Sequence, residues 1–231
     1  MSISENIAAI REKMAAAARE AGRDPGEILL VGASKMNDAA ACKAAIAAGI
    51  DALGENRVQE MTAKLSEDAY TGAPLHFIGH LQRNKVKQVV GKVDLIQSVG
   101  SLELLAEIEK TAAKLELVQN ILLEVNIGGE EAKSGFAPED VEAAARVALE
   151  CPHVCVQGLM TIPPADAAPE ENRAYFNKVR ALYVDINAKL FHNDFKYLSM
   201  GMSGDFEDAI RCGATMVRVG TAIFGARYYP T

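Results

Sequence analysis

The stretch ILLVGASKMNDAAACKAAIAAGIDALGE, residues 28–55, determines the fold class. Residues 28–34 are an apolar run typical of a buried strand, and residues 51–55 form a second, shorter run. Between them, the Ala-rich segment 38–48 predicts a helix, and Gly49 stands where that helix should end. A strand, a helix and a second strand in close succession are typical of a parallel sheet with crossover helices.

The same alternation continues along the chain. The expected strands are residues 28–34, 51–55, 75–79, 94–98, 119–126, 156–161, 196–200 and 215–219. The expected helices between them include residues 38–48, 57–67, 102–114, 138–149 and 170–190. A further amphipathic helix begins at Ser4 with Glu5 and ends near Gly22. Eight such strands favour a single α/β domain, residues 1–231, folded as a closed (β/α)8 TIM barrel with an extra N-terminal helix.

A doubly wound open sheet is the alternative for alternating strands and helices, but no GxGxxG motif follows the first strand. Composition is that of an ordinary soluble globule, with 49% hydrophobic and 24% charged residues. The net charge of -7 argues against a nucleic-acid surface. The N-terminus carries no signal pattern, and no apolar stretch is long enough to span a bilayer. We therefore expect a cytoplasmic protein that binds neither nucleic acid nor membrane.

No CxxC pair occurs among the four cysteines, which are Cys42, Cys151, Cys155 and Cys212. This pattern indicates reduced thiols in a cytosolic protein. Cys151, His153 and Cys155 provide three soft ligands at alternate positions, but Pro152 and the lack of a nearby fourth ligand argue against zinc. We expect no metal site.

Lys35 comes directly after the apolar run of the first expected strand. In one interpretation, its side chain extends along apolar surface and brings the ammonium group to water. In the other, desolvation removes the proton and the amine forms a Schiff base with an aldehyde. A phosphate-binding pattern near the C-terminus favours the second interpretation.

That pattern consists of two glycine-containing segments after the last two expected strands. They are LSMGMSGD at residues 198–205 and VRVGTAIFG at residues 217–225. Ser203 adds a hydroxyl donor, and Gly220 and Thr221 stand where a short helix would begin. The loops after strands seven and eight are where barrel enzymes usually hold phosphate. Together with Lys35, these loops predict pyridoxal 5'-phosphate (PLP) as the cofactor.

Arg218 lies on the opposite side of its strand from Val217 and Val219, so we expect it inside the barrel mouth. There it could donate a hydrogen bond to the ring nitrogen of PLP and keep that nitrogen unprotonated. The alternative is a structural arginine paired with a buried carboxylate such as Glu55.

Several motifs occur in an order characteristic of one known family. They are GASK at 32–35, GENRVQE at 54–60, HFIGHLQRNK at 76–85, GLM at 158–160, LSMGMSGD at 198–205 and VRVGTAIFGAR at 217–227. With these motifs the chain resembles the pyridoxal phosphate homeostasis protein family, from about residue 5 to residue 228. Leu75 and Gln97 depart from it, standing where an aromatic residue and a histidine are common, and we expect neither to affect the cofactor contacts.

The resemblance implies a fold like the N-terminal barrel of alanine racemase, with PLP as a Schiff base on Lys35. It also implies a role in vitamin B6 and amino-acid homeostasis without established catalytic turnover. By motif, Arg218 would face the pyridine nitrogen. Ser203, Gly220 and Thr221 would hold the phosphate. The remaining pocket residues would be Asn56, His80, Ser199 and Met202.

A PLP carrier is the function we expect, and an amino-acid racemase-like enzyme is the alternative. Racemisation requires a base on each face of the substrate. Alanine racemase takes its second base from an additional β-domain. The sequence after the eighth expected strand leaves no room for such a domain. His80 and Tyr228 are substitute candidates, but a rim histidine and a packing tyrosine are the simpler interpretations. A phosphosugar-binding barrel without PLP is a third hypothesis. For the carrier we expect a monomer with transient contacts to PLP enzymes and affinity for amino acids.

Overall fold

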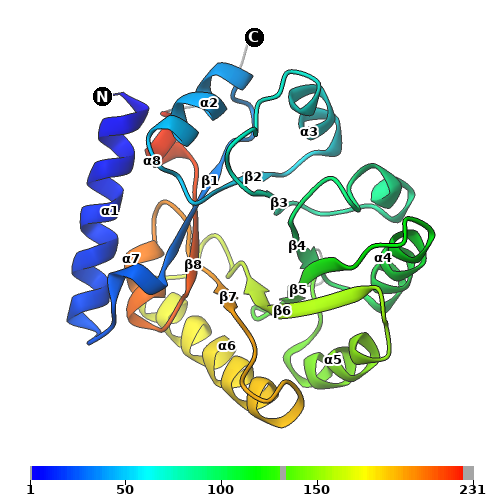
Figure 1. Cartoon of the computed structure of the whole chain (residues 1–231). Coiled ribbons are helices and arrows are strands. Elements are labelled where there is room, and N and C mark those ends of the chain that lie inside the picture. The colour runs from blue at the N-terminus through cyan, green and yellow to red at the C-terminus, as the bar shows by residue number, and fades with distance from the viewer. Residues whose placement is uncertain (1, 131–133, 226–231) are drawn as a thin grey trace.

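A computed structural model describes residues 2–130 and 134–225 of the chain. Eight parallel strands pair in chain order and close into a barrel, in which Leu29 of the first strand lies beside Met216 of the last (Figure 1). The strands are β1 (Leu29–Ala33), β2 (Ala52–Glu55), β3 (Leu75–Phe77), β4 (Leu95–Val99), β5 (Gln119–Val125), β6 (Val154–Thr161), β7 (Tyr197–Ser199) and β8 (Met216–Val219). All eight expected strands are confirmed, most of them one or two residues shorter than expected, and the open sheet is excluded.

The helices surround the barrel. They are α1 (Ile3–Glu20), α2 (Ala39–Ala47), α3 (Val58–Leu65), α4 (Leu102–Lys114), α5 (Val141–Leu149), α6 (Pro169–Leu190), α7 (Phe206–Arg211) and α8 (Thr221–Phe224). Short 3-10 helices are η1 (Pro25–Glu27), η2 (Arg83–Gln88) and η3 (Pro138–Asp140). Within the described ranges, none of the helices combines the length and the apolarity needed to cross a membrane.

The start of α1 differs from the expectation. Ser2, rather than Ser4, is the N-cap residue, since the Ser2 hydroxyl accepts the Glu5 N–H while the Glu5 carboxylate accepts the Ser2 N–H. This reciprocal pair is a capping box with the spacing S-x-x-E. Ser4 lies inside the first turn.

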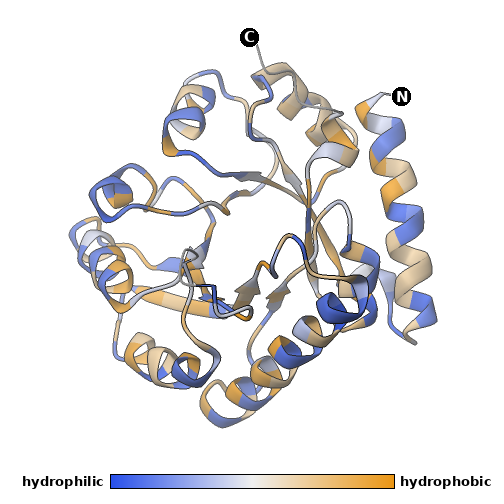
Figure 2. Ribbon diagram, turned by 180° about the vertical axis from the view of Figure 1, so that it is seen from behind, coloured by the Kyte–Doolittle hydropathy of each residue, from blue (hydrophilic) through white to orange (hydrophobic). Residues whose placement is uncertain are grey.

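Apolar side chains fill both the barrel and the layer around it. The interior cluster takes one residue from each of six strands: Val31, Ala52, Leu95, Leu122, Met160 and Met216. A larger cluster lies between the strands and the helices and includes Leu30, Leu53, Phe77 and Ile108. Accordingly, helices such as α6 are hydrophobic on one side and hydrophilic on the other (Figure 2).

The extra helix α1 lies outside the barrel along α7 and α8 (Figure 1). Its buried residues Ile7, Ile10 and Met14 follow the helical spacing of an apolar stripe. The Asn6 side chain donates to the Ile223 carbonyl at 2.8 Å, so the first helix is joined directly to the last.

Candidate functional site

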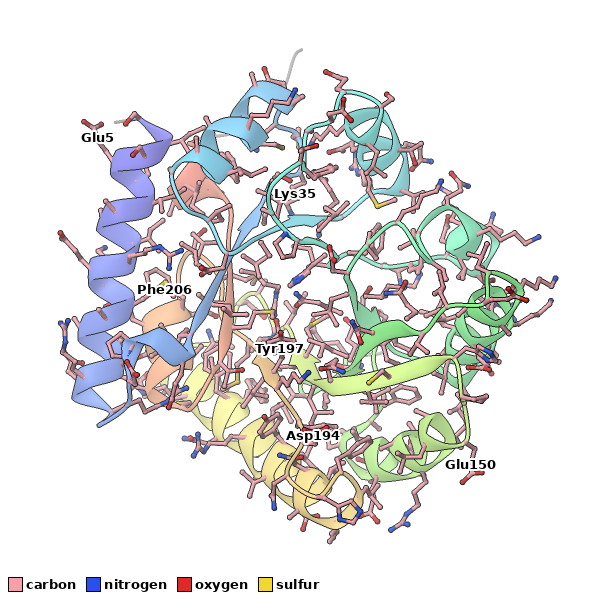
Figure 3. All side chains as sticks on the ribbon, viewed as in Figure 1. Glu5, Lys35, Glu150, Asp194, Tyr197 and Phe206 are labelled. Carbon is pink, nitrogen blue, oxygen red and sulfur yellow. The ribbon has the colours of Figure 1, made fainter. Side chains whose placement is uncertain are left out.

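Lys35 lies in a tight turn at the carboxyl end of β1 (Figure 3). The Asn37 N–H donates to the Ser34 carbonyl at 3.1 Å, and Met36 has a positive φ of 63°. A non-glycine residue in this region is uncommon and needs support from its surroundings. The Glu60 carboxylate supplies it by accepting the Met36 N–H at 2.8 Å. The backbone around the half-buried Lys35 is therefore held in one conformation.

A buried ion pair supports this turn from the β2 side. Glu55 Oε1 accepts hydrogen bonds from Lys64 Nζ at 2.6 Å, Ser34 Oγ at 2.6 Å and Tyr70 Oη at 3.0 Å. Lys64 also donates to the Ser34 carbonyl at 2.8 Å. Burial, followed by the charge of Glu55, raises the pKa of the Tyr70 hydroxyl, which keeps it a donor. Glu55 is thus not the partner of Arg218, and that alternative for Arg218 is wrong.

Arg218 lies inside the barrel mouth, as its position in β8 predicts, and only 4% of its surface is exposed. Its guanidinium donates to Ser199 Oγ at 2.6 Å and to the Thr161 carbonyl at 2.9 Å. Burial lowers the pKa of Arg218 to about 10, although the charges of Asp205 and Glu124 oppose this effect. Even so, the guanidinium stays protonated at neutral pH.

A chain of hydrogen bonds continues from Arg218 into the barrel. The Ser199 hydroxyl donates to Gln97 Oε1 at 2.6 Å, and Gln97 Nε2 lies 3.0 Å from His76 Nδ1. Burial lowers the pKa of His76 to about 4, so the ring is neutral at physiological pH and its Nδ1 accepts from Gln97. Gln97 thus contacts Ser199, a residue expected in the pocket, and its expected lack of effect on the cofactor contacts stays a prediction.

The two glycine-containing loops meet at the carboxyl end of the barrel. The Gly220 N–H donates to Ser203 Oγ at 3.3 Å, which joins the loop after β7 to the loop after β8. A Cβ at Gly220 would lie 3.2 Å from the Ala33 carbonyl, so this meeting point adjoins the strand that leads to Lys35. Thr221 is the first residue of α8, as expected, and is exposed. Met202 is 39% exposed, and its N–H donates to Asp205 Oδ1 at 2.6 Å.

Asn56 and His80 lie on another part of the mouth. Together they line a cavity of about 590 Å³ that we call the β3–β5 cavity, with Ile78, Gly79, Glu124, Val125, Asn126, Ser134 and Ile162. Gly79 is required here because a Cβ would collide with the Asn56 backbone. Asn56 Oδ1 is buried and has no hydrogen-bond partner among the described residues.

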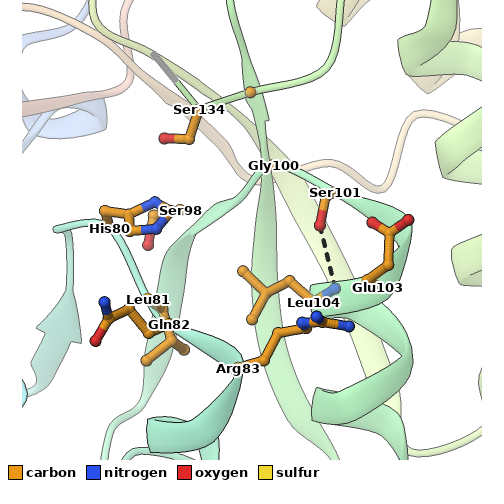
Figure 4. Close-up of a pocket in the computed structure, with 11 residues that line it drawn as sticks. His80, Leu81, Gln82, Arg83, Ser98, Gly100, Ser101, Glu103, Leu104 and Ser134 are labelled. Atoms are coloured by element: carbon orange, nitrogen blue, oxygen red, sulfur yellow. Dashed lines mark hydrogen bonds between the residues drawn. The ribbon is translucent and has the colours of Figure 1, made fainter. Parts of the chain in front are cut away.

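A second cavity of about 570 Å³ adjoins the first and shares His80 and Ser134 with it. Figure 4 shows its other side, where Arg83 and Glu103 lie near the start of α4 and Ser101 accepts the Leu104 N–H. The exposed His80 thus stands between two openings at the rim.

Sequence reasoning overlooked Glu124, His76 and the role of Gln97. Each is a buried polar residue beside apolar ones in its strand, at a position whose side chain faces the barrel interior. Glu124 in the run NILLEV carried the clearest signal, because a carboxylate in a buried strand needs a partner. Tyr228, the other proposed base, lies outside the described residues.

The chain is similar to proteins of one kind over its whole length. The family model described as alanine racemase, N-terminal domain, matches residues 4–228. A pyridoxal phosphate homeostasis protein of Aquifex aeolicus is 43% identical over 229 residues, which are 99% of this chain and 100% of the relative. The protein of the same name from Escherichia coli K12 is 37% identical and covers 98% of this chain and 97% of its own length.

Solved structures agree with these matches. PipY of Synechococcus elongatus, determined with PLP bound, superposes with a TM-score of 0.84 at 32% identity and covers 97% of this chain and 100% of its own. An alanine racemase of Clostridium difficile superposes with a TM-score of 0.70 at 19% identity and covers 100% of this chain. The superposed part is 57% of the racemase chain.

Proposed function

Because the chain belongs to the pyridoxal phosphate homeostasis protein family, we propose that it binds PLP at the barrel mouth as a Schiff base on Lys35. In this role it would hold the cofactor for vitamin B6 and amino-acid homeostasis in the cell. When bound, PLP supplies an aldehyde that forms imines with primary amines. The observation that carries the proposal is the Ser203–Gly220 hydrogen bond, which joins the two phosphate-loop candidates beside the strand that ends in Lys35.

The two loops fit a phosphate group. Because Ser203 Oγ accepts the Gly220 N–H, the Ser203 hydroxyl proton can be donated to a phosphate oxygen. Thr221 adds a second hydroxyl, and the first N–H groups of α8 have no carbonyl partner within the helix. These donors offer several hydrogen bonds to an anion at one point of the rim.

Arg218 fits the pyridine ring of the cofactor. Its guanidinium has five N–H donors, and within the described ranges it bonds only to neutral oxygens, those of Ser199 and Thr161. A further N–H would be donated to the ring nitrogen, which an arginine keeps unprotonated because the guanidinium does not give up its proton. Asn56, His80 and Met202 would complete the pocket, with Met202 contributing its side chain since its N–H is already bound to Asp205.

The test is borohydride reduction of the purified protein after incubation with PLP, followed by peptide mapping. We expect a pyridoxyl adduct on the Lys35 peptide and none in Lys35→Ala, whose fold should be intact because the half-buried side chain is no part of the core. Lys85, in the rim motif after His80, serves as the control, since Lys85→Ala should load normally. An adduct on Lys85, or on no lysine, would refute the assignment.

We propose a carrier rather than a racemase, because within residues 2–130 and 134–225 Lys35 is the strong base expected at the cofactor, and Arg218 leaves the ring a poor electron sink. The expected result is slow exchange of the α-proton of L-alanine in deuterated water with stoichiometric PLP. Exchange at about 1 s⁻¹ or faster, which is typical of working enzymes, would contradict the carrier and point to His80 as a second base.

The proposed setting is the cytoplasm, where the protein would act as a monomer and pass PLP to apo-enzymes through transient contacts. Size-exclusion chromatography with light scattering, run with and without PLP, measures the oligomeric state directly. A stable dimer under both conditions would contradict the monomer.

A further inference from the structure

Glu124 is the buried carboxylate for which neither the fold nor the proposed cofactor contacts give a role. It belongs to β5, is 8% exposed, and lines the β3–β5 cavity. We infer that this cavity binds the ammonium group of a small molecule, an amine or an amino acid, with Glu124 as its counter-ion.

The first reason is that Glu124 lacks a cationic partner. Its carboxylate accepts one side-chain hydrogen bond, from Ser134 Oγ to Oε2 at 3.0 Å, and no salt bridge reaches it within the described part of the chain. Arg218 and His80 act on Glu124 only through space, and burial raises its pKa. A buried carboxylate of this kind is costly without a cation, so binding of an external cation relieves the cost.

The second reason is that the side-chain oxygen of one cavity residue, Asn56, lacks a hydrogen-bond donor among the described residues. Asn56 is another residue of this cavity, and its Oδ1 is buried and has no hydrogen-bond partner among residues 2–130 and 134–225. A buried carboxylate and an unpartnered amide oxygen among the residues of one cavity fit a ligand that brings several N–H donors. A primary ammonium group has three such donors and the positive charge that Glu124 requires, whereas a carboxylate or phosphate would be repelled.

The position of the β3–β5 cavity near the proposed cofactor residues indicates what ammonium binding would do, and this step rests on the proposed function. Asn56 follows β2, which pairs with β1, the strand that ends at Lys35. Ile162, another lining residue, follows Thr161, whose carbonyl binds Arg218. The ammonium site would therefore lie at the same end of the barrel as Lys35 and Arg218, where an amine or amino acid could reach the cofactor. Glu124 would act as a residue that selects amines as ligands.

The test uses the full chain free of PLP, with glutamate labelled at the side-chain carboxyl carbon, and follows the NMR signals during titration with propylammonium chloride. We expect a saturable shift of the Glu124 signal, identified by its loss in Glu124→Gln and independently by its displacement in Ser134→Ala. Tetramethylammonium chloride, which has the charge but no N–H, should leave the signal in place. In calorimetry, Glu124→Gln should weaken propylammonium binding by about tenfold or more, as expected for a lost charged hydrogen bond.

The matched control is Glu103→Gln, which removes an exposed carboxylate from the adjoining cavity and should bind propylammonium like the unaltered protein. Absence of a Glu124 shift, or an equal shift with tetramethylammonium, would overturn the inference. Failure here with PLP still attached to Lys35 would leave the proposed function standing. Conversely, propylammonium binding without any PLP attachment would support the ammonium site and refute the cofactor proposal.

Discussion

Glu55 and Arg218 are both buried charges at the mouth of the barrel, one on β2 and one on β8, but their partners differ in kind. Glu55 bonds directly to a cation, Lys64, and to two hydroxyl groups. Arg218 bonds to a serine hydroxyl and a backbone carbonyl, and carboxylates act on it only from a distance. The charge of Glu55 is therefore used within the protein, whereas that of Arg218 remains available to a ligand. On this basis the β1–β2 side supports the turn at Lys35, and the β7–β8 side is the proposed binding surface.

The largest expected effect comes from Lys64→Met, which leaves Glu55 buried without its counter-ion. Removing one partner of a buried ion pair costs about 3–5 kcal/mol, so we expect a loss of this size in urea unfolding. Lys43→Met, which removes an exposed lysine that donates to the Glu67 carbonyl, should change stability by less than about 0.5 kcal/mol. A loss below about 1 kcal/mol for Lys64→Met would show that the pair does not stabilise the turn.

The free energy of unfolding should fall in acid because of His76, which is linked to Arg218 through Gln97 and Ser199. The unfolded chain takes up this proton near pH 6.5, but burial lowers the pKa of His76 to about 4 in the folded protein. The unfolded state thus binds more protons between these values, so stability falls as pH falls through this window and the loss is complete below pH 4. We expect the His76 contribution to be on the order of 3 kcal/mol.

The measurement is the unfolding free energy of the native protein and of His76→Gln at several pH values. The variant should show a flatter dependence between pH 6.5 and 4, whereas His192→Gln, which alters a surface histidine, should follow the native protein. If the unfolding free energies of the native protein and of His76→Gln depend on pH in the same way, His76 is not the source of the acid sensitivity.

A smaller effect, confined to cofactor binding, is expected from Ser203→Ala combined with Thr221→Val. PLP affinity should fall by about 2 kcal/mol, because hydrogen bonds to a charged group are lost while backbone donors remain. Equilibrium dialysis measures this change, and Ser66→Ala on the β2 side provides the comparison, since its exposed hydroxyl bonds only to the Ala63 carbonyl. Unchanged affinity in the double variant would place the phosphate elsewhere.

The barrel itself could be predicted because each strand is a short apolar run whose ends carry glycine, proline or polar residues. Ser203 and Gly220 could be predicted as neighbours for a related reason: loops after adjacent parallel strands emerge on the same face. The chain from Arg218 through Ser199 and Gln97 to His76 could not, because it joins side chains from β8, β7, β4 and β3 by orientation alone. Periodicity predicts that such residues face inward but does not identify their partners.

Glu55 and Glu124 illustrate the same limit. Each is a glutamate near the end of an apolar strand, and in the sequence they differ little. Only the three-dimensional arrangement shows that Lys64 and Tyr70, from α3 and the loop after it, reach Glu55, whereas among residues 2–130 and 134–225 the Glu124 carboxylate is reached by Ser134. The distinction between a structural carboxylate and one facing a cavity therefore depends on contacts between segments that the sequence does not pair.

The packing of α1 against α7 and α8 has a consequence for synthesis on the ribosome. Helix α1 is made before α7 and α8, yet it packs against both of them, and Asn6 bonds to Ile223. Strand β1 likewise waits for β8 to close the barrel. Because such long-range contacts form late, a growing chain cannot bury the stripe of Ile7, Ile10 and Met14 completely until α7 and α8 have been translated. Slow translation of the last two strands would prolong that exposure and favour aggregation.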